Sequence, residues 1–488
     1  MPARPFSALL KEALDLDWEG AGDPPVRAVT EDSREAVPGS LFVAVRGRRD
    51  GHEFAAGALA RGAVAVVAER PLELDAPVVV VSDTRVALAM LAAAIHGWPA
   101  RRLRLIGVTG TDGKTTTSWL LHHALQSAGV ETGLLGTVGK RIGPAALHLL
   151  PGHLTTQPAP ALHAALREMT DAGCGTAVLE VSSHSLAQHR TAGLDFEIGV
   201  FTNLSPEHLD YHGTLSEYLE TKARLTDSAR VAVVNLADPA APRLIAGSRR
   251  AVTFADASLD ADVRSLEVTA TPGGYRVAAE VRGVGGFEFQ LPLPGRYNVA
   301  NALAALAAAW QAGLPPARAA AHLKHFPGVP GRMQVLARSP RVIVDFAHTP
   351  VALARVLAEL RSSTTGRLWV VIGSAGERDP AKRAPLGETA ARLADTVVLT
   401  EEDSRSEWVD AILAEMMAGA RLAPLGASRT LVVPDRHDAI RTAIRAAAPD
   451  DTVVLAGKGP EATLERAAEV IPWDEAGVAR KALAERAT

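Results

Sequence analysis

Cysteine is almost absent from this sequence, because Cys174 is the single one among 488 residues. One cysteine excludes an intrachain disulfide and a zinc site built from cysteines. No apolar run approaches the roughly 18 residues of a membrane span, and the N-terminal stretch has acidic residues where a signal peptide needs an apolar segment. The net charge of −4 lacks the basic excess of a nucleic-acid binder or a polybasic membrane anchor. Together these absences are typical of a cytoplasmic protein.

Lysine is also scarce, since it accounts for eight of the 51 basic residues. Arginine supplies most of the positive charge, so we expect a lysine where a compact ammonium or a reactive amine is required. Lys114, Lys222 and Lys458 each lie in one of the motifs described below.

The stretch 103–128 carries the strongest functional signal. An apolar strand leads into a glycine-rich loop, after which Lys114 and Thr115 open an amphipathic helix. Such a loop points backbone N–H groups at an anion, and the helix N-terminus adds the positive end of its dipole. Lys114 can reach the β- and γ-phosphates, and the Thr115 hydroxyl can join a Mg²⁺ shell. Val108 replaces the first glycine of the usual motif, yet the order of elements predicts nucleotide binding.

Apolar strands alternate with helical patterns along the whole chain, which predicts an α/β protein of three domains. Residues 1–97 form a small α/β domain without a phosphate loop. Residues 98–332 carry the phosphate loop on a parallel sheet, with a small antiparallel sheet at about 260–293. Residues 333–488 form a Rossmann-like, doubly wound parallel sheet.

Polar residues gather where the predicted strands of the second domain end. Glu180 ends one apolar strand, and the strand 198–202 leads into His208, Asp210 and His212. Open α/β sheets bind ligands at this edge. Carboxylates beside a phosphate loop favour a Mg²⁺-assisted phosphoryl site. On residue type alone, we interpret His212 as an ordinary loop histidine, and Asp210 as a carboxylate that could simply cap a turn.

The third domain shows the same pattern, because polar clusters follow its predicted strands at 345–350, 373–383, 401–407 and 457–461. All of them would lie at one carboxyl edge, so this domain is expected to bind a ligand as well. In the first domain, the polar stretch 32–34 is by itself more typical of a solvated turn.

Taken together, the motifs resemble the Mur ligase family, and most closely its MurE-type branch, which adds a diamino acid to UDP-N-acetylmuramoyl-L-alanyl-D-glutamate. The resemblance covers nearly the whole chain, and its motifs follow the family order. They are DSR (32–34), GTDGKTT (110–116), TT (155–156), EVSSHSLAQHR (180–190), TNLSPEHLDYHG (202–213), YLETK (218–222), NVANALAA (298–305), GRM (331–333), DFAHTP (345–350), GERD (376–379) and GKGPE (457–461).

The resemblance implies a role for individual residues of these motifs. The implied ATP-binding residues are Gly110, Thr111, Asp112, Gly113, Lys114, Thr115, Thr116, Asn301, Arg332 and Asp345. The implied catalytic residues are Lys114, Glu180, His208 and Lys222, and the implied metal ligands are Thr115, Glu180, His208 and Lys222 as a carbamate. The implied contacts to the UDP-muramoyl dipeptide are Ser33, at its uracil end, and Thr155, Thr156, Ser182, Gln188 and Arg190. The implied contacts to the amino acid are Arg378, Glu402, Asp403, Ser404, Arg405, Gly457 and Glu461.

The implied reaction is an ATP-dependent amide ligation in peptidoglycan precursor synthesis. The D-Glu side-chain carboxylate attacks the γ-phosphate of ATP, and the amine of the amino acid then displaces phosphate from the acyl phosphate. Mg²⁺ ions and Lys114 would neutralise the oxygens between like-charged reactants. The resemblance further implies a monomer with ATP and Mg²⁺ as cofactors, small-molecule substrates, and neither a nucleic-acid nor a membrane partner.

The acceptor loop departs from the family members that take meso-diaminopimelate. These carry D-N-P-R where this chain has the residues 402–405, EDSR, and they usually have His where it has Pro460. Arg405 suits a distal carboxylate, whereas the added carboxylates suit a distal ammonium. We therefore favour lysine or ornithine over diaminopimelate as the diamino acid.

Two alternatives have a sequence feature against them. Folylpolyglutamate synthase has the same phosphate loop but is disfavoured by the stretches 180–190 and 376–379. A non-catalytic Mur-like nucleotide-binding subunit is disfavoured because Glu180, His208 and Lys222 are all present, and because one cysteine cannot build the four-cysteine zinc site of such relatives.

Overall fold

The computed structural model describes residues 3–20, 22–47, 49–150, 154–256, 260–271 and 273–487. The chain divides into two compact units, Met1–Leu291 with Arg296–Phe326 and Pro292–Gly295 with Pro327–Thr488. Both units combine helices with largely parallel sheets, which confirms the predicted α/β class. The boundaries predicted after residues 97 and 332 stay predictions. No helix within the described ranges is long and apolar enough to cross a membrane.

The N-terminal part of the first unit is built on a small parallel sheet. Its elements are β1 (Arg4–Pro5), α1 (Phe6–Leu14), β2 (Pro25–Val26), β3 (Ala28–Thr30), β4 (Ser40–Val43), the 3₁₀-helix η1 (Gly51–Phe54), α2 (Ala55–Ala60), β5 (Ala63–Ala68), β6 (Val78–Val80), α3 (Thr84–Ile95) and the 3₁₀-helix η2 (Pro99–Arg102). The strands pair in the order β3-β4-β5-β6. The Asp83 carboxylate accepts hydrogen bonds from the backbone N–H groups of Arg85 and Val86 in the first turn of α3 and so caps this helix. The apolar faces of α1 and α3 pack on this sheet.

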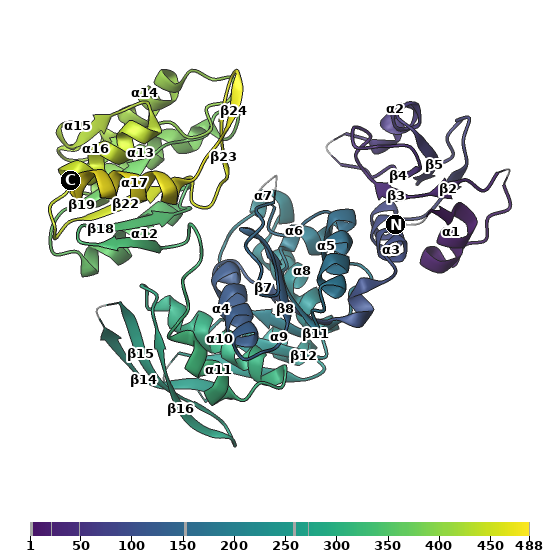
Figure 1. The fold of residues 1–488 in the computed structure, drawn as a ribbon, viewed down its shortest axis with the longest axis horizontal. Coiled ribbons are helices and arrows are strands. Elements are labelled where there is room, and N and C mark those ends of the chain that lie inside the picture. The colour runs from purple at the N-terminus through teal and green to yellow at the C-terminus, as the bar shows by residue number, and fades with distance from the viewer. Residues whose placement is uncertain are drawn as a thin grey trace. The chain divides into compact units, whose positions relative to one another are not determined.

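The rest of the first unit is organised around one large sheet (Figure 1). Its strands are β7 (Arg104–Thr109), β8 (Thr132–Gly136), β9 (Gly139–Ile142), β10 (Thr176–Glu180), β11 (Phe196–Phe201), β12 (Val231–Asn235), β13 (Ala251–Ala255), β14 (Val263–Thr271), β15 (Gly274–Val281) and β16 (Gly285–Leu291). Its helices are α4 (Lys114–Ser127), α5 (Ala159–Asp171), α6 (Ser183–Ala187), α7 (Leu209–His212), α8 (Leu215–Ser228), α9 (Ala241–Gly247), α10 (Tyr297–Gln311) and α11 (Pro316–Leu323). The strand order is β16-β15-β14-β13-β12-β11-β7-β10-β8-β9.

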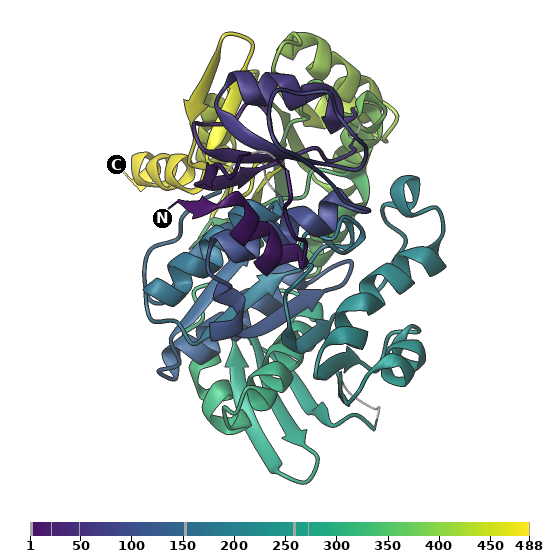
Figure 2. The same ribbon diagram turned by 90° about the vertical axis from the view of Figure 1, so that its right-hand side faces the viewer.

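The strands at the centre of this sheet bring the predicted site residues to one edge. β7 pairs in parallel with both β10 and β11, and Glu180 lies opposite Val108 while Phe201 lies opposite Thr109. The carboxyl ends of the three strands are therefore adjacent. The antiparallel strands expected near 260–293 are β14, β15 and β16 (Figures 1 and 2). They do not form a separate sheet, because β14 pairs in parallel with β13 and so extends the central sheet.

The second unit is a doubly wound sheet, as predicted. Its strands are β17 (Gln334–Arg338), β18 (Arg341–Asp345), β19 (Leu368–Ile372), β20 (Thr396–Leu399), β21 (Thr430–Val432), β22 (Thr452–Ala456), β23 (Thr463–Arg466) and β24 (Glu469–Pro472). Its helices are α12 (Pro350–Ser363), the 3₁₀-helix η4 (Pro380–Lys382), α13 (Arg383–Leu393), α14 (Val409–Ala420), α15 (Gly426–Arg429), α16 (Arg436–Ala446) and α17 (Glu475–Ala487). The main sheet has the order β17-β18-β22-β19-β20-β21, with β17 antiparallel, while β23 and β24 form a hairpin.

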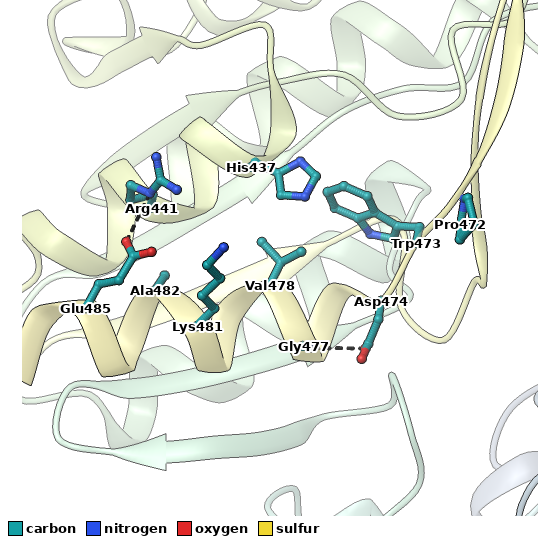
Figure 3. Close-up of a pocket in the computed structure, with 10 residues that line it drawn as sticks. All are labelled: His437, Arg441, Pro472, Trp473, Asp474, Gly477, Val478, Lys481, Ala482 and Glu485. Carbon is teal, nitrogen blue, oxygen red and sulfur yellow. Dashed lines mark hydrogen bonds and ion pairs between the residues drawn. The ribbon is translucent and has the colours of Figure 1, made fainter.

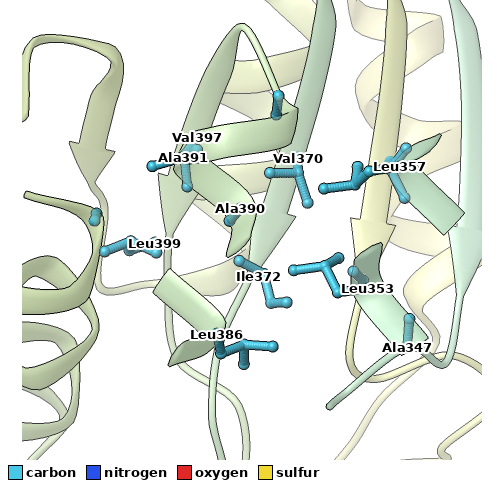
Figure 4. Packing of buried hydrophobic residues seen from close by; sticks show 14 of the residues in the cluster. Ala347, Leu353, Leu357, Val370, Ile372, Leu386, Ala390, Ala391, Val397 and Leu399 are labelled. Carbon is cyan, nitrogen blue, oxygen red and sulfur yellow. The ribbon is translucent and has the colours of Figure 1, made fainter. Parts of the chain in front are cut away.

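The sequence of β19, LWVVI, explains why helices cover both faces of this sheet. Side chains alternate between the faces of a strand. Val370 and Ile372 pack with Leu353 and Leu357 of α12 in one core (Figure 4). Trp369 lies in the core on the other face, with residues of α16 and α17. A strand buried on both faces has to be apolar at every position.

Candidate active site

The glycines of the phosphate loop are fixed by close neighbours. The loop leaves β7 and enters α4, with φ of +145° at Gly110 and +81° at Gly113. A Cβ at Gly110 would lie 1.9 Å from Thr202 Oγ1, and one at Gly113 would lie 2.3 Å from Asn301 Oδ1. Neither position can therefore hold a larger residue, since both the backbone conformation and the space require glycine.

Polar contacts tie the rest of this loop down. Lys114 Nζ donates to the Gly110 and Thr111 carbonyls at 2.9 and 2.7 Å, so its ammonium lies over the loop. The Asp112 N–H donates to the Asn203 side chain at 2.9 Å. Thr115 and Thr116 follow in the first turn of α4. Asn301, on α10, accepts a hydrogen bond from the Thr117 hydroxyl of α4 at 3.4 Å, and its Oδ1 faces Gly113, so it lies beside the loop.

Glu180 is fully buried at the end of β10 and is held by neutral groups. Its Oε2 accepts hydrogen bonds from the hydroxyls of Thr115 and Thr137, both at 2.8 Å, and its Oε1 accepts from the Thr137 N–H at 3.1 Å. Burial raises the pKa of this carboxyl. A buried carboxylate with neutral partners creates a place suited to a cation.

Thr137 was missed by the sequence analysis. It follows the end of β8, beside Gly136, where a Cβ would come within 2.0 Å of Glu180 Oε1. The Thr137 hydroxyl also lies 3.2 Å from that of Thr155. The signal available in the sequence is a Gly-Thr pair after an apolar strand, at the same edge of the sheet as Glu180.

Lys222 reaches the phosphate loop from α8. Its side chain is 1% exposed, and Nζ donates to the Gly110 carbonyl at 2.7 Å. The ring of Tyr218, one helical turn earlier, lies 4.4 Å from Nζ. Burial, aided by the charge of Lys114, lowers the pKa of Lys222 well below its usual value. This amine is therefore easily obtained in its neutral, nucleophilic form.

His208 lies in a cluster of aromatic rings rather than against Glu180. Its ring centroid is 4.8 Å from that of His184 and 6.4 Å from that of Tyr218. His212 is the last residue of the short helix α7 rather than a loop residue, and its Nε2 lies 3.0 Å from the Ser183 hydroxyl. In the described ranges, no three His, Cys, Asp or Glu side chains converge to hold a metal ion.

The residues expected to hold the muramoyl dipeptide form one network around the end of β10. The Thr156 hydroxyl donates to the Glu180 carbonyl at 2.9 Å and accepts from the Ser182 N–H at 3.0 Å. Arg190 donates to the Thr156 carbonyl at 2.7 Å and to Gln188 Oε1 at 2.8 Å.

Ser33 lies in the loop that follows β3, outside this network. Two residues earlier, Glu31 lines a small cavity together with Arg85, Gln188 and Arg190. Ser33 and Arg34 themselves lie in a turn and are half-buried and exposed, respectively.

In the second unit, Arg332 and Asp345 lie together. The Arg332 guanidinium stands 4.8 Å from the centre of the Phe346 ring. Asp345 is buried and accepts from the backbone N–H groups of Met333 and Ala347 at 2.8 and 2.9 Å. Burial raises the pKa of Asp345, and the positive charge of Arg332 opposes that rise.

The acceptor residues meet at the ends of β20 and β22, except Arg378, which is exposed in the loop before α13. Asp403 Oδ1 accepts from Lys458 Nζ at 2.7 Å, and Lys458 also pairs with Glu461. Burial raises the pKa of Glu461 to about 7. Lys458 was not predicted as a site residue, although its motif and the scarcity of lysine were both visible.

Glu402 and Ser404 are buried in the same loop, at 6% and 4% exposed. Glu402 Oε2 faces Gly457, where a Cβ would lie 3.1 Å away. Gly457 itself has φ of +99°, which also requires glycine.

A surface pocket of about 260 Å³ in the second unit contains none of the predicted residues. It lies between α16 and α17, where His437 and Trp473 stand edge to face and Arg441 pairs with Glu485 (Figure 3). Trp473 Nε1 donates to Glu475 at 2.8 Å. Glu475 in turn forms a buried ion pair, so this side of the pocket is hydrogen-bonded to the interior of the unit.

A phosphate loop on a parallel sheet, a buried carboxylate and a buried lysine beside it, and a second sheet with a charged edge define a nucleotide-dependent enzyme. Three family models match the chain in order. They are the "Mur ligase family, catalytic domain" over residues 25–96, the "Mur ligase middle domain" over 108–309, and the "Mur ligase, glutamate ligase domain" over 331–459.

Full-length relatives agree with these matches. The UDP-N-acetylmuramyl-tripeptide synthetase of Deinococcus radiodurans is 49% identical over 95% of this chain and 96% of its own. The UDP-N-acetylmuramoyl-L-alanyl-D-glutamate–2,6-diaminopimelate ligase of Geobacillus thermodenitrificans is 40% identical, again over 95% and 96%. A solved structure of a ligase with that name covers both chains completely, with a TM-score of 0.70 and 33% identity.

The chain belongs to the Mur ligase family. It is an ATP-dependent ligase, and these comparisons favour neither of the two alternatives considered from the sequence.

Proposed function

We propose that this enzyme joins a diamino acid to the D-Glu side chain of UDP-N-acetylmuramoyl-L-Ala-D-Glu, in cytoplasmic peptidoglycan precursor synthesis and as a monomer. The names of the relatives from Deinococcus and Geobacillus support this substrate class. The observation that carries the proposal is the buried Glu180, bonded to Thr115 beside a phosphate loop that also receives Lys222.

The donors around Glu180 fit Mg²⁺. Carboxylate and hydroxyl oxygens are the ligands that this ion prefers, and the neutral partners of Glu180 leave its charge for a cation. His208 would be a further ligand. When bound, Mg²⁺ would neutralise phosphate oxygens and so favour attack by the D-Glu carboxylate.

Lys222 is proposed to carry a carbamate. Its neutral amine would add CO₂ and release one proton, which converts a buried neutral amine into a carbamate anion near the phosphate loop. Arginine cannot undergo this addition, so the use of lysine here in an arginine-rich chain agrees with the proposal.

The remaining predicted residues are assigned by position. Lys114 and the loop amides would hold the ATP phosphates, with Asn301, Arg332 and Asp345 as further nucleotide contacts. The network of Thr155, Thr156, Ser182, Gln188 and Arg190 would orient the dipeptide, and Ser33 the uridine. The charged edge of the second unit would bind the amino acid.

The proposal is tested by phosphate release with ATP, Mg²⁺ and UDP-N-acetylmuramoyl-L-Ala-D-Glu, with L-lysine, L-ornithine or meso-diaminopimelate added in turn. Release that depends on one amino acid supports ligation. Glu180→Gln should abolish it, whereas Glu168→Gln, at an exposed glutamate on α5 paired with Lys140, should not. If ATP binds but none of the three amino acids leads to phosphate release, the proposed substrates are refuted.

A further inference from the structure

The guanidinium of Arg405 is occupied by the protein itself. Its Nε donates to Glu465 Oε2 at 2.8 Å, and its Nη1 donates to the Gly376 carbonyl at 2.6 Å. The third nitrogen, Nη2, lies 3.8 Å from Asp403 Oδ2. An arginine binds a ligand carboxylate best through two parallel hydrogen bonds. A distal carboxylate on the substrate would therefore have to compete with Glu465 for Arg405.

The position of Glu465 follows from the backbone and is not a chance surface contact. Glu465 lies on β23, whose hairpin with β24 is labelled in Figure 1. Its carbonyl accepts from the Arg405 N–H at 3.1 Å, and its own N–H donates to Asp403 Oδ1 at 2.9 Å. The acceptor loop is thus attached to β23 on both sides of Ser404, and Arg405 holds a φ of +51° within it.

The rest of the cluster is rich in negative charge. Glu402 is 6% exposed, and its Oε2 has no hydrogen-bond partner within the residues that the structure describes. It faces the space left by Gly457. Lys458, the buried ammonium of this cluster, is paired with Asp403 and with Glu461. A buried carboxylate oxygen without a hydrogen-bond partner is costly, and the ammonium of a ligand can supply the missing donor.

We propose that Glu465 is a specificity-determining residue: by occupying Arg405, it leaves a site that selects a diamino acid with a distal ammonium and no distal carboxylate. L-Lysine and L-ornithine have this chemistry, and meso-diaminopimelate does not. The inference rests on the proposed ligase function, and it goes further because it assigns the choice of amino acid to a residue outside the acceptor loop.

The first measurement is kcat/KM of the wild-type enzyme for L-lysine, L-ornithine and meso-diaminopimelate, under saturating ATP and muramoyl dipeptide. We expect kcat/KM for the better of the two cationic amino acids to exceed that for diaminopimelate by at least about tenfold, because, within the residues that the structure describes, the second carboxylate of diaminopimelate would lie among carboxylates without a free cation to pair with. A preference for diaminopimelate would overturn the inference. If no amino acid supports phosphate release, the proposed function itself fails, and this inference falls with it.

The second measurement compares Glu465→Gln with Glu469→Gln. Glu469 lies on the same hairpin and pairs with Arg466 at 3.5 Å, so it is a matched control for loss of one carboxylate. Glu465→Gln removes the negative charge that holds Arg405, so it should lower the preference for the cationic amino acid over diaminopimelate by about tenfold, chiefly through a lower KM for diaminopimelate. Adding Arg405→Ala to this variant should remove the gain. If the ratio of kcat/KM for the cationic amino acid to kcat/KM for diaminopimelate is the same in Glu465→Gln and Glu469→Gln, the role of Glu465 is refuted. If Glu465→Gln does not fold, the same ratio in the wild-type enzyme still tests the selectivity.

Discussion

Thr137 binds both oxygens of the Glu180 carboxylate, with its backbone N–H on Oε1 and its hydroxyl on Oε2. The same hydroxyl lies 3.2 Å from Thr155, one of the residues assigned to the dipeptide. Thr137 therefore connects the proposed metal site with the proposed substrate site, and its hydroxyl can be removed without changing the shape of the side chain.

We expect Thr137→Val to reduce kcat by about ten- to a hundredfold, because a buried carboxylate oxygen loses a hydrogen bond worth about 1–3 kcal/mol. The Mg²⁺ concentration that gives the half-maximal rate should be higher in the same variant. Thr137→Ser, which keeps the hydroxyl, should stay close to the wild type in steady-state kinetics. Equal rates for the valine and serine variants would show that the hydroxyl has no role.

Lys222→Ala should abolish ligation, since the variant can neither form the proposed carbamate nor contact the Gly110 carbonyl. A small carboxylic acid added to the assay should restore part of the activity by standing in for the carbamate. The matched control is Lys140→Ala, at a lysine ion-paired with Glu168 away from the loop. Near-normal turnover of Lys222→Ala would remove this lysine from the mechanism.

Arg436→Met should lower the free energy of unfolding of the second unit by about 3–5 kcal/mol, because it leaves the Glu475 carboxylate buried without its counter-charge. Both side chains of this ion pair are 0% exposed, with Nη2 and Oε1 2.6 Å apart. The double variant Arg436→Met, Glu475→Leu should recover much of the loss. Denaturant unfolding measures each value, and Arg392→Met, which breaks a surface pair with Glu388, should change it by less than about 1 kcal/mol.

His163 predicts a loss of stability at acid pH. It is fully buried on α5, neither ring nitrogen has a hydrogen-bond partner within the described part of the chain, and burial lowers its pKa to about 4. The unfolded chain, with an ordinary histidine pKa near 6.5, binds the proton more readily. The free energy of unfolding should therefore fall as the pH drops from about 6.5 to about 4, by about 3 kcal/mol from this residue.

Urea unfolding at several pH values should show a smaller acid-induced loss for His163→Leu than for the wild type. His325→Leu, at an exposed histidine, is the control and should follow the wild type. Parallel pH profiles for His163→Leu and the wild type would contradict the assignment.

The parts of the site that the sequence predicted are those encoded locally. The phosphate loop could be found because strand, glycines, Lys114 and helix follow one another within a few residues. Glu180 could be placed because the carboxyl edge of a parallel sheet is defined by where its apolar strands end.

The parts that it could not predict depend on contacts between distant segments. Thr137 meets Glu180 across 43 positions, and Arg405 meets Glu465 across 60. Their spacing along the chain has no period that would reveal the pairing. For the same reason, the pairing of β13 with β14, which makes the central sheet continuous, was not visible in the alternation of residues at 260–293.

Lys114 and Lys222 donate to the same atom, the carbonyl oxygen of Gly110. No side-chain substitution can delete that atom, because it belongs to the main chain at a position where only glycine fits. Replacing either lysine with alanine would remove one of the two hydrogen-bond donors to this carbonyl and change the environment of the other lysine. Their effects should therefore fail to add in a double-mutant cycle, and the size of this failure would measure how strongly the two lysines are coupled through the Gly110 carbonyl.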